Sequence, residues 1–281
     1  MTSLTLQQAL LHAHRAGLAR IDAQLLLLHA LQQPEADRAW LLTHDQDVLT
    51  AEQSALFTAL CTRRLDGEPV AYLTGRKEFF GLPLQVDARV LDPRPDTETL
   101  VEWALELLEG TATPRVVDLG TGSGAIALAL KFQRPDAQVT AVDASADALA
   151  VARANAQRLQ LPVAFVQSSW LEQVSGVFDA IVTNPPYIRE DDPHMPALRH
   201  EPRQALTSGA DGLDDIRAII DQALAQLAPG GWLLIEHGWD QAGEVRQLLT
   251  QAGFTAVHSR QDLAGTERCS GGQRPPVPKA P

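Results

Sequence analysis

The segment Val116-Val-Asp-Leu-Gly-Thr-Gly-Ser-Gly124 decides the fold class of this chain. Its apolar beginning predicts a strand, its glycines predict a tight loop, and the apolar run from Ala125 predicts a helix. A strand that leads through a glycine-rich loop into a helix is typical of a small-molecule site at the carboxyl edge of a parallel sheet. The segment therefore predicts an α/β domain that binds a ligand at this loop.

The spacing and the charge of this loop indicate which ligand it takes. Its pattern is G-x-G-x-G instead of the dinucleotide pattern G-x-G-x-x-G, and Asp118 stands before Gly120, where it would repel a pyrophosphate. A ligand with a cationic end, such as S-adenosylmethionine, fits better. Asp118 would face its ammonium group, the loop backbone would flank its chain, and Asp143, 23 residues after Gly120, would accept hydrogen bonds from both ribose hydroxyls. The alternative is a tight strand–helix turn in which Asp118 is only a cap.

A second loop, Asn184-Pro-Pro-Tyr187, follows a predicted strand over 180–182 and so belongs to the same edge of the sheet. Its two prolines fix φ and lack N–H groups, which leaves the carbonyls of the turn free to accept hydrogen bonds. The Asn184 side-chain carbonyl and the Pro185 backbone carbonyl can hold a planar NH2 group, and Tyr187 can lie against its flat face. The alternative is a structural turn in which Asn184 is a local cap.

The expected chemistry of this loop is transfer to a nitrogen whose lone pair is conjugated. Such a nitrogen is a poor nucleophile, and two fixed acceptors both orient it and stabilise the positive charge that develops on it. No titratable base is needed, because the proton on nitrogen becomes acidic once the methyl group is attached. The loop therefore predicts an amine-holding site next to a methyl donor.

Outward from these loops, strands and helices alternate along the chain, which predicts a doubly wound, Rossmann-like sheet. The expected strands are 116–119, 139–142, 163–166, 180–182, 232–235 and 255–258, and the expected helices begin at Ala125, Ala146, Leu213 and Gln241. Upstream, the period of the apolar residues predicts a helical bundle with helices over 4–15, 20–31, 37–43 and 51–65. Between them, the alternation after Gly81 predicts a β-hairpin. The expected organisation is a helical domain over 1–75, a hairpin linker over 76–95 and an α/β domain over 96–281, with 264–281 as a mobile tail.

Length, composition and charge narrow the class further. The chain has 281 residues with 45% hydrophobic and 21% charged residues, which fits a globular protein of two domains. Its net charge is −12, and residues 1–75, 76–98 and 99–281 each carry more acidic than basic groups, which argues against binding to a phosphate backbone. No membrane span, secretion signal or metal-ligand spacing is visible, so no membrane and no metal are expected. Cys61 and Cys269 alone make no disulfide framework, which favours a reducing cytoplasm.

With both loops placed, the chain resembles the peptide chain release factor glutamine methyltransferases, the protein-(glutamine-N5) methyltransferases of the bacterial HemK type. Besides the two loops, the resemblance rests on four further motifs and spans nearly the whole length. They are Glu68-Pro-Val-Ala-Tyr-Leu-Thr-Gly75, Pro93-Arg-Pro-Asp-Thr-Glu98, Glu201-Pro-Arg-Gln-Ala-Leu206 and Ile235-Glu-His-Gly238. The resemblance implies the class I fold that binds S-adenosylmethionine and releases S-adenosylhomocysteine.

The resemblance also implies a target and a set of site residues. The target is the Gln side chain in the Gly-Gly-Gln loop of release factors, with the helical domain helping to dock this protein substrate. The residues implied to hold the Gln are Asn184, Pro185, Pro186 and Tyr187, with Arg94 and Glu98 assigned to the substrate side, and those implied to hold the cofactor are Asp118, Leu119, Gly120, Thr121, Gly122, Asp143, Trp170 and Asn184. One departure is Ser168-Ser169-Trp170, which has only hydroxyls where the family usually has an acid before the Trp, and which puts a carboxylate contact to adenine in doubt. Arg94 and Glu98 can instead be an ordinary surface pair near a helix start.

Three competing interpretations remain open from the sequence. A DNA adenine-N6 or RNA guanine-N2 methyltransferase would use the same amine-holding loop, but it would need a basic surface that this acidic chain lacks. An inactive cofactor-binding module associated with translation factors would have no need for Asn184 and Tyr187. The chain also contains Gly271-Gly-Gln273, a copy of the implied target tripeptide, for which chance recurrence is favoured over self-methylation. A monomer is expected.

Overall fold

The structure, a computed structural model, describes residues 4–35 and 37–276 and divides into two compact units. One unit comprises Met1–Arg76 together with Pro196–His200, and the other comprises Lys77–Met195 and Glu201–Pro281. The short segment 196–200 therefore groups with the helical unit although it lies far along the chain, and Asp66 binds His200 Nε2 there at 3.5 Å. The expected helical domain ended at residue 75 and did not include this segment.

The helical unit is built from amphipathic segments whose starts are capped. Thr5 and Thr50 each accept a hydrogen bond from the backbone three residues on, and Gln8 and Gln53 return one, which are two capping boxes. Leucines such as Leu26 and Leu27, both fully buried, form its core. The helices of this unit are α1 (Leu6–Arg15), α2 (Arg20–Ala30), α3 (Trp40–Thr43), α4 (Ala51–Leu65) and α5 (Val70–Thr74). The expected helix over 37–43 is thus only its last turn.

The hairpin between the two predicted domains consists of β1 (Arg76–Phe79) and β2 (Leu82–Gln85). Phe80 and Gly81 form its turn with positive φ angles of 51° and 77°. β2 is held to the α/β unit by Asn155, which accepts from the Gln85 backbone N–H at 2.8 Å and donates to its carbonyl at 2.9 Å. Because Asn155 is fully buried, these bonds satisfy a side chain that would otherwise be costly to bury.

The second unit is a doubly wound α/β sandwich around a sheet of seven strands in the order β5-β4-β3-β6-β7-β9-β8, within the described residues. The strands are β3 (Arg115–Leu119), β4 (Gln138–Asp143), β5 (Ala164–Gln167), β6 (Phe178–Thr183), β7 (Leu227–Glu236), β8 (Thr255–Gln261) and β9 (Glu267–Gln273). β3 to β7 pair in parallel, and the order reverses beside β3. The carboxyl ends of β3, β4 and β6 therefore meet at a topological switch point, where ligands bind in such sheets.

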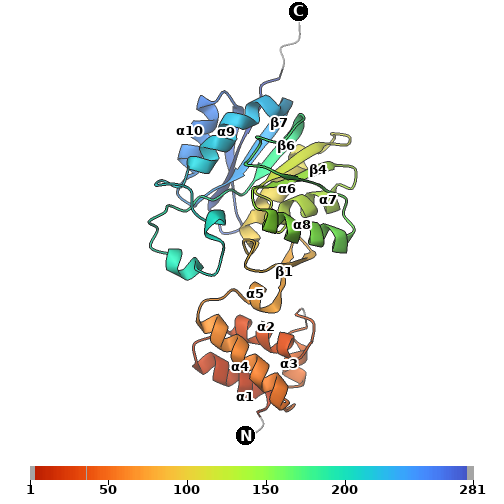
Figure 1. Cartoon of the computed structure of the whole chain (residues 1–281), viewed down its shortest axis with the longest axis vertical. Helices are drawn as coiled ribbons and strands as arrows, with labels where there is room; N and C mark the ends of the chain where they lie inside the picture. The colour runs from red at the N-terminus through yellow and green to blue at the C-terminus, as the bar shows by residue number, and fades with distance from the viewer. Residues whose placement is uncertain (1–3, 36, 277–281) are drawn as a thin grey trace, which may run out of the picture. The chain divides into compact units, whose positions relative to one another are not determined.

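Helices cover both faces of this sheet, and Figure 1 shows α9 and α10 together on one side with α6, α7 and α8 on the other. These helices are α6 (Glu98–Leu107), α7 (Ala125–Gln133), α8 (Ala146–Leu159), α9 (Asp214–Gln226) and α10 (Ala242–Gln251). Short 3-10 turns occur at Pro95–Thr97, Met195–Leu198 and Arg203–Ala205. The predicted fold class is confirmed, and Ala125 and Ala146 begin their helices as expected.

The C-terminal segment corrects the expectation of a mobile tail over 264–281. Glu267–Gln273 is β9, which pairs antiparallel with both β7 and β8 and so lies inside the sheet. A Cβ on Gly271 would lie 2.8 Å from the Trp103 ring, and one on Gly272 would lie 2.8 Å from Phe254, so both glycines are needed for close packing. The Gly-Gly-Gln tripeptide is therefore locked in a strand, which explains it without self-methylation. Residues 277–281 lie outside the described part of the chain.

Candidate active site

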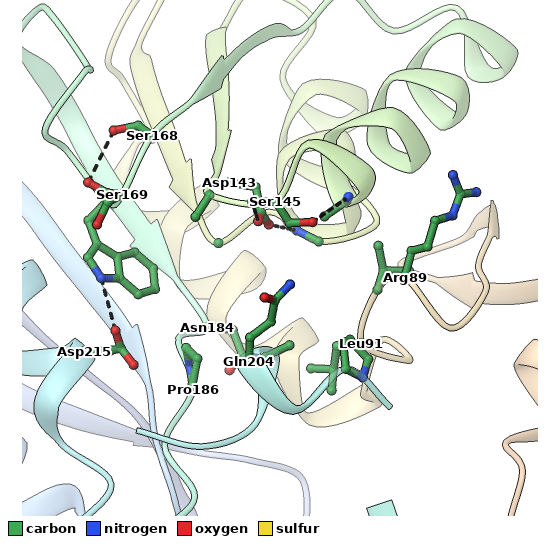
Figure 2. A pocket seen from close by; sticks show the side chains of 18 residues that line it. Arg89, Leu91, Asp143, Ser145, Ser168, Ser169, Asn184, Pro186, Gln204 and Asp215 are labelled. Atoms are coloured by element: carbon green, nitrogen blue, oxygen red, sulfur yellow. Dashed lines mark hydrogen bonds between the residues drawn. The ribbon is translucent and has the colours of Figure 1, made fainter. Parts of the chain in front are cut away.

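A cavity of about 250 Å³ opens at the carboxyl edge of the sheet, in the second unit. Each of the strands β3, β4, β5 and β6 is followed by residues that line it. The predicted site residues among its lining are Gly120, Gly122, Asp143, Trp170, Asn184 and Pro186. Figure 2 shows Asp143 and Ser145 on one wall and Asn184, Pro186 and Gln204 on the facing wall. Both predicted loops thus contribute to one cavity.

The glycine-rich loop reaches the cavity with its backbone. Gly120 and Gly122 have φ angles of 69° and 54°. Residues other than glycine adopt such positive φ angles only with backbone strain. The Gly122 N–H donates to Asp143 Oδ2 at 2.9 Å, and the Ser145 N–H donates to Asp143 Oδ1 at 2.9 Å. These bonds fix the Asp143 carboxylate and leave each oxygen a second lone pair for a ligand hydroxyl. Burial nevertheless raises the pKa of Asp143.

Asp118 does not line the cavity. It is fully buried, and its Oδ2 accepts from Thr121 Oγ1 at 2.6 Å and from the Ala127 N–H at 3.1 Å, which joins β3 to the first turn of α7. Its Oδ1 has no hydrogen-bond partner within the described residues, and burial raises its pKa to about 7. The alternative expected from the sequence, in which Asp118 caps the strand–helix turn, thus accounts for its Oδ2. The other oxygen is an unpaired acceptor that a cationic ligand group would satisfy, so the predicted contact with an ammonium stays a prediction. Leu119 is also fully buried and outside the lining.

The amine-holding loop is anchored on both sides. Asn184 Nδ2 donates to Thr97 Oγ1 at 3.2 Å, and the Tyr187 carbonyl accepts from Gln241 Nε2 at 3.1 Å. Asn184 and Pro186 line the cavity, whereas Pro185 is buried and Tyr187 is half-buried beside it. Burial raises the pKa of Tyr187 far above its ordinary value, so its hydroxyl stays neutral. The loop is therefore rigid, and it presents the Asn184 side chain to the cavity.

Trp170 closes one end of the cavity over the first glycine. A Cβ on Gly120 would lie 3.4 Å from the Trp170 ring, so the small residue permits this contact. The indole Nε1 donates to Asp215 Oδ1 at 3.2 Å, as Figure 2 shows, and the Asp215 N–H donates to Ser208 Oγ at 2.8 Å. Ser168 and Ser169 line the same end. A carboxylate therefore stands near the position where the sequence lacks one.

Arg94 and Glu98 lie outside the cavity lining. Arg94 Nη2 binds Glu201 Oε1 at 2.5 Å, and Glu98 Oε1 accepts from the Phe80 N–H at 2.9 Å in the hairpin turn. Neither side chain pairs with the other in the hydrogen bonds and ion pairs of the described residues. Both fix the segments around the cavity, and their predicted contact with substrate stays a prediction.

Several lining residues received no role from the sequence, among them Arg89, Leu91, Gln204 and Asp215. Gln204 lies in the Glu201–Leu206 motif, which the sequence analysis noted without giving Gln204 a role of its own. Asp215 is one of two consecutive acids in the first turn of α9, a place where acidic residues are common for helix stability alone. Among the described residues, no cluster of three or more His, Cys, Asp or Glu side chains is placed to hold a metal. No helix in the described part of the chain has the length and apolar character to cross a membrane.

Comparisons with known proteins agree with this architecture. Residues 97–256 match the family model "Methyltransferase small domain", and residues 4–75 match "PrmC N-terminal domain". The chain is 51% identical to a release factor glutamine methyltransferase of Bordetella pertussis over 260 residues, which covers 91% of this chain and 95% of the relative. It is 44% identical to the protein of that name from Escherichia coli K12, over 95% of this chain and 97% of the relative.

Among solved structures, the fold resembles the Thermus thermophilus 16S rRNA N2 G1207 methyltransferase. That match has a TM-score of 0.55 at 22% identity and covers 71% of this chain and 49% of the other. The catalytic domain of hMettl16 matches with a TM-score of 0.56 at 17% identity, over 72% of this chain and 78% of the other. At this level of identity the likeness concerns the fold.

The switch-point cavity, the glycine-rich loop and the matched domain define a methyltransferase of the class I fold. Because identity of 44% to 51% extends over nearly the whole chain, the protein belongs to the release factor glutamine methyltransferase family.

Proposed function

We propose that this protein transfers a methyl group from S-adenosylmethionine to the side-chain amide nitrogen of the Gln in the Gly-Gly-Gln loop of peptide chain release factors, in support of translation termination. The single observation that carries the proposal is one cavity lined both by the glycine-rich loop with Asp143 and by the amine-holding loop with Asn184. A methyl donor and a planar amide can thus be held within reach of each other. The match to release factor enzymes supports this choice of target.

The cofactor end of the cavity fits S-adenosylmethionine in shape and charge. Asp143 would accept hydrogen bonds from the ribose hydroxyls, because Gly122 and Ser145 hold its carboxylate at the cavity wall. The unpaired Oδ1 of Asp118 suits a nearby positive charge. The indole of Trp170, held by Asp215, offers a flat apolar face to the adenine. When bound, the cofactor supplies an electrophilic methyl group on a cationic sulfur.

At the target end, this chain's residues hold the amide and need not remove its proton beforehand. The Asn184 side-chain carbonyl and the Pro185 backbone carbonyl would accept the two N–H bonds of the Gln amide, and the Tyr187 ring would lie against its plane. These acceptors stabilise the positive charge that develops on nitrogen in the transition state. Methylation gives a positively charged amide nitrogen that still carries both of its protons. This cation is strongly acidic, so it loses one proton to water.

The macromolecular partner is a protein, bound without direct nucleic-acid contact. The net charge of −12 argues against a surface that follows a phosphate backbone. The helical unit, whose residues 4–75 match the PrmC N-terminal domain, is assigned to docking the release factor. We assign the enzyme to the cytoplasm, where translation takes place, and expect it to act as a monomer.

The test is methyl transfer from labelled S-adenosylmethionine to a purified release factor, to its Gln→Ala variant in the Gly-Gly-Gln loop, and to unmodified DNA and RNA in parallel. Label on the intact factor alone is the expected result. Equal label on the Gln→Ala factor would place the methyl group elsewhere, and label on DNA or RNA would support the base-methylating alternative. No label on any substrate would leave the inactive module as the better description.

A further inference from the structure

Glu236 is a buried carboxyl group at the end of β7 that the proposed chemistry does not use. Its residue is 1% exposed, and its Oε2 has no hydrogen-bond partner in the part of the chain that the structure describes. A buried carboxylate with an unpaired oxygen is costly, and an apolar residue there would avoid the cost. The position therefore needs a reason beyond packing.

The register of the sheet places Glu236 beside the amine-holding loop. Thr183 pairs with Ile235 in the parallel ladder of β6 and β7, so the next residues along the two strands are Asn184 and Glu236. On its other side, Glu236 pairs with Cys269 of β9. The carboxyl group is thus set next to the loop by the sheet itself.

Asn184, Thr97 and Glu236 form a small polar cluster behind the amine-holding loop. Asn184 Nδ2 donates to Thr97 Oγ1 at 3.2 Å, and Thr97 is 4% exposed. Thr97 and Asn184 also interact with Glu236 itself, since both of these polar side chains favour its ionised form and so lower its pKa. Both side chains therefore act on the same carboxylate, which can accept hydrogen bonds and cannot donate them while it is ionised.

We propose that Glu236 is a positioning residue that fixes the orientation of the Asn184 amide. With its NH2 group drawn toward Thr97 and the carboxylate, the side chain has its carbonyl oxygen left for the cavity. That carbonyl is the atom needed to accept an N–H of the target amide, so this inference rests on the proposed function of Asn184. A reversed amide would present N–H to N–H, which repels the target.

Ionisation of Glu236 makes this orientation dependent on pH. Burial raises its pKa to about 7, while the interactions with Thr97 and Asn184 and the charge of Arg268 oppose the rise and Asp96 adds to it. Tyr187 and Cys269 are the other titratable groups that interact with it, and the pKa of each is raised so far that both stay neutral. When protonated, Glu236 is able to donate, and the network no longer imposes one orientation. Turnover should therefore rise with pH through an acidic limb near neutrality.

The experiment compares kcat and KM for methyl transfer to a purified release factor, between about pH 6 and pH 9, in the full-length enzyme and three variants. Glu236→Gln keeps the shape but has both a donor and an acceptor. Thr97→Val removes the hydroxyl that links Asn184 to the carboxylate. Ser270→Ala is the matched control, since Ser270 is fully buried on β9 opposite Ile235 and bonds to His237 and Ser259, away from the loop.

We expect Glu236→Gln to lower kcat about tenfold and to abolish the acidic limb, with the affinity for S-adenosylmethionine changed less than about twofold. Thr97→Val should lower kcat in the same direction, and Ser270→Ala should retain both kcat and the limb. A Glu236→Gln enzyme with the original kcat and limb overturns the inference. Should that variant fail to fold, a Thr97→Val enzyme with unchanged kcat overturns it instead.

Two further measurements, on the Asn184→Ala enzyme and on the release factor with Gln→Ala, separate this inference from the proposed function. If Asn184→Ala still transfers at the original rate, or if the release factor with Gln→Ala is methylated equally, the proposed role of Asn184 fails whatever Glu236 does. If Asn184→Ala loses activity and the Gln→Ala release factor is not methylated, the proposed function stands. If Glu236→Gln then keeps the original kcat and pH dependence, only the positioning role fails.

Discussion

Each of the two loops that line the cavity has a buried carboxyl group close by. The two carboxyl groups differ in the residues with which they interact. Asp118 at the end of β3 and Glu236 at the end of β7 are 0% and 1% exposed, and burial raises the pKa of each to about 7. Each also has one oxygen without a partner within the described residues. Their electrostatic situations are thus nearly the same.

Their partners are not the same. Asp118 binds Thr121 and Ala127, which lie three and nine residues further along the chain, so its bonds shape the glycine-rich loop from within. Glu236 interacts with Thr97 and Asn184, which come from a 3-10 turn and a loop far away in the sequence. The comparison teaches that the cofactor loop is locally determined, whereas the target loop depends on the assembled sheet.

The largest effect that would sharpen this comparison is expected from Asn184→Ala. Loss of a fixed acceptor aimed at the reacting nitrogen should lower kcat by about 10²-fold or more, because that interaction is strongest in the transition state. The affinity for S-adenosylmethionine should change less than about threefold, since Asp143 and Gly122 remain. Single-turnover methyl transfer and calorimetric titration of the cofactor measure the two quantities. A parallel loss in both would erase the separation between the loops.

The next effect tests how strongly the target end depends on β9. Gly271→Ala should lower the free energy of unfolding by about 3 kcal/mol, since the added Cβ would lie 2.6 Å from the Leu234 side chain and 2.9 Å from the Leu233 carbonyl. Gly243→Ala in α10 is the matched control, because nothing lies within 4 Å of its added Cβ. Denaturant titrations of both variants provide the measurement. Equal stability of the two would mean that β9 is not tightly packed in the sheet.

The pH dependence of stability should show what the two carboxyl groups share. The ordinary pKa values are 3.8 for Asp118 and 4.5 for Glu236, and both rise to about 7 in the fold. The folded state therefore binds protons more readily than the unfolded state in this range, so the free energy of unfolding should fall as pH rises from about 4 to 7 and remain low above it. At about 1.4 kcal/mol per pKa unit, Asp118 should contribute about 4 kcal/mol and Glu236 about 3 kcal/mol to this fall.

Asp118→Asn and Glu236→Gln should each reduce that fall when unfolding is followed without cofactor across the same pH range. They should differ in kinetics, because Asp118→Asn is expected to raise KM for S-adenosylmethionine and Glu236→Gln to lower kcat. If one substitution moved both kinetic constants equally, the two loops would not be served by separate groups.

The sequence predicted the features that depend on neighbouring residues and missed those that depend on distant segments. Local patterns predicted α8, the capping box of α4 and both loops, since each depends on residues a few positions apart. β9 was missed because Gly271 and Gly272 lower strand propensity and are chosen for contacts with Trp103 and Phe254, which no local pattern contains. Asp215 and Glu236 were missed as site residues for the same reason. Their contacts exist only after distant segments meet.

The smallest expected effect concerns the end of the cavity where Ser169 replaces the usual acid. Asp215→Ala should weaken S-adenosylmethionine binding by about fivefold, close to 1 kcal/mol, because Trp170 Nε1 loses its acceptor and the indole is freer to rotate. Asp215→Asn is the matched variant, since its side-chain carbonyl still accepts that hydrogen bond.

If only the orientation of Trp170 matters, Asp215→Asn should bind S-adenosylmethionine like the unmodified enzyme. If the carboxylate charge also attracts the adenine amine, its affinity should fall between the two, and titration calorimetry with S-adenosylmethionine and S-adenosylhomocysteine distinguishes these results. Equal affinity in all three proteins would mean that this end of the cavity contributes nothing to cofactor binding, and that the glycine-rich loop and Asp143 hold the cofactor alone.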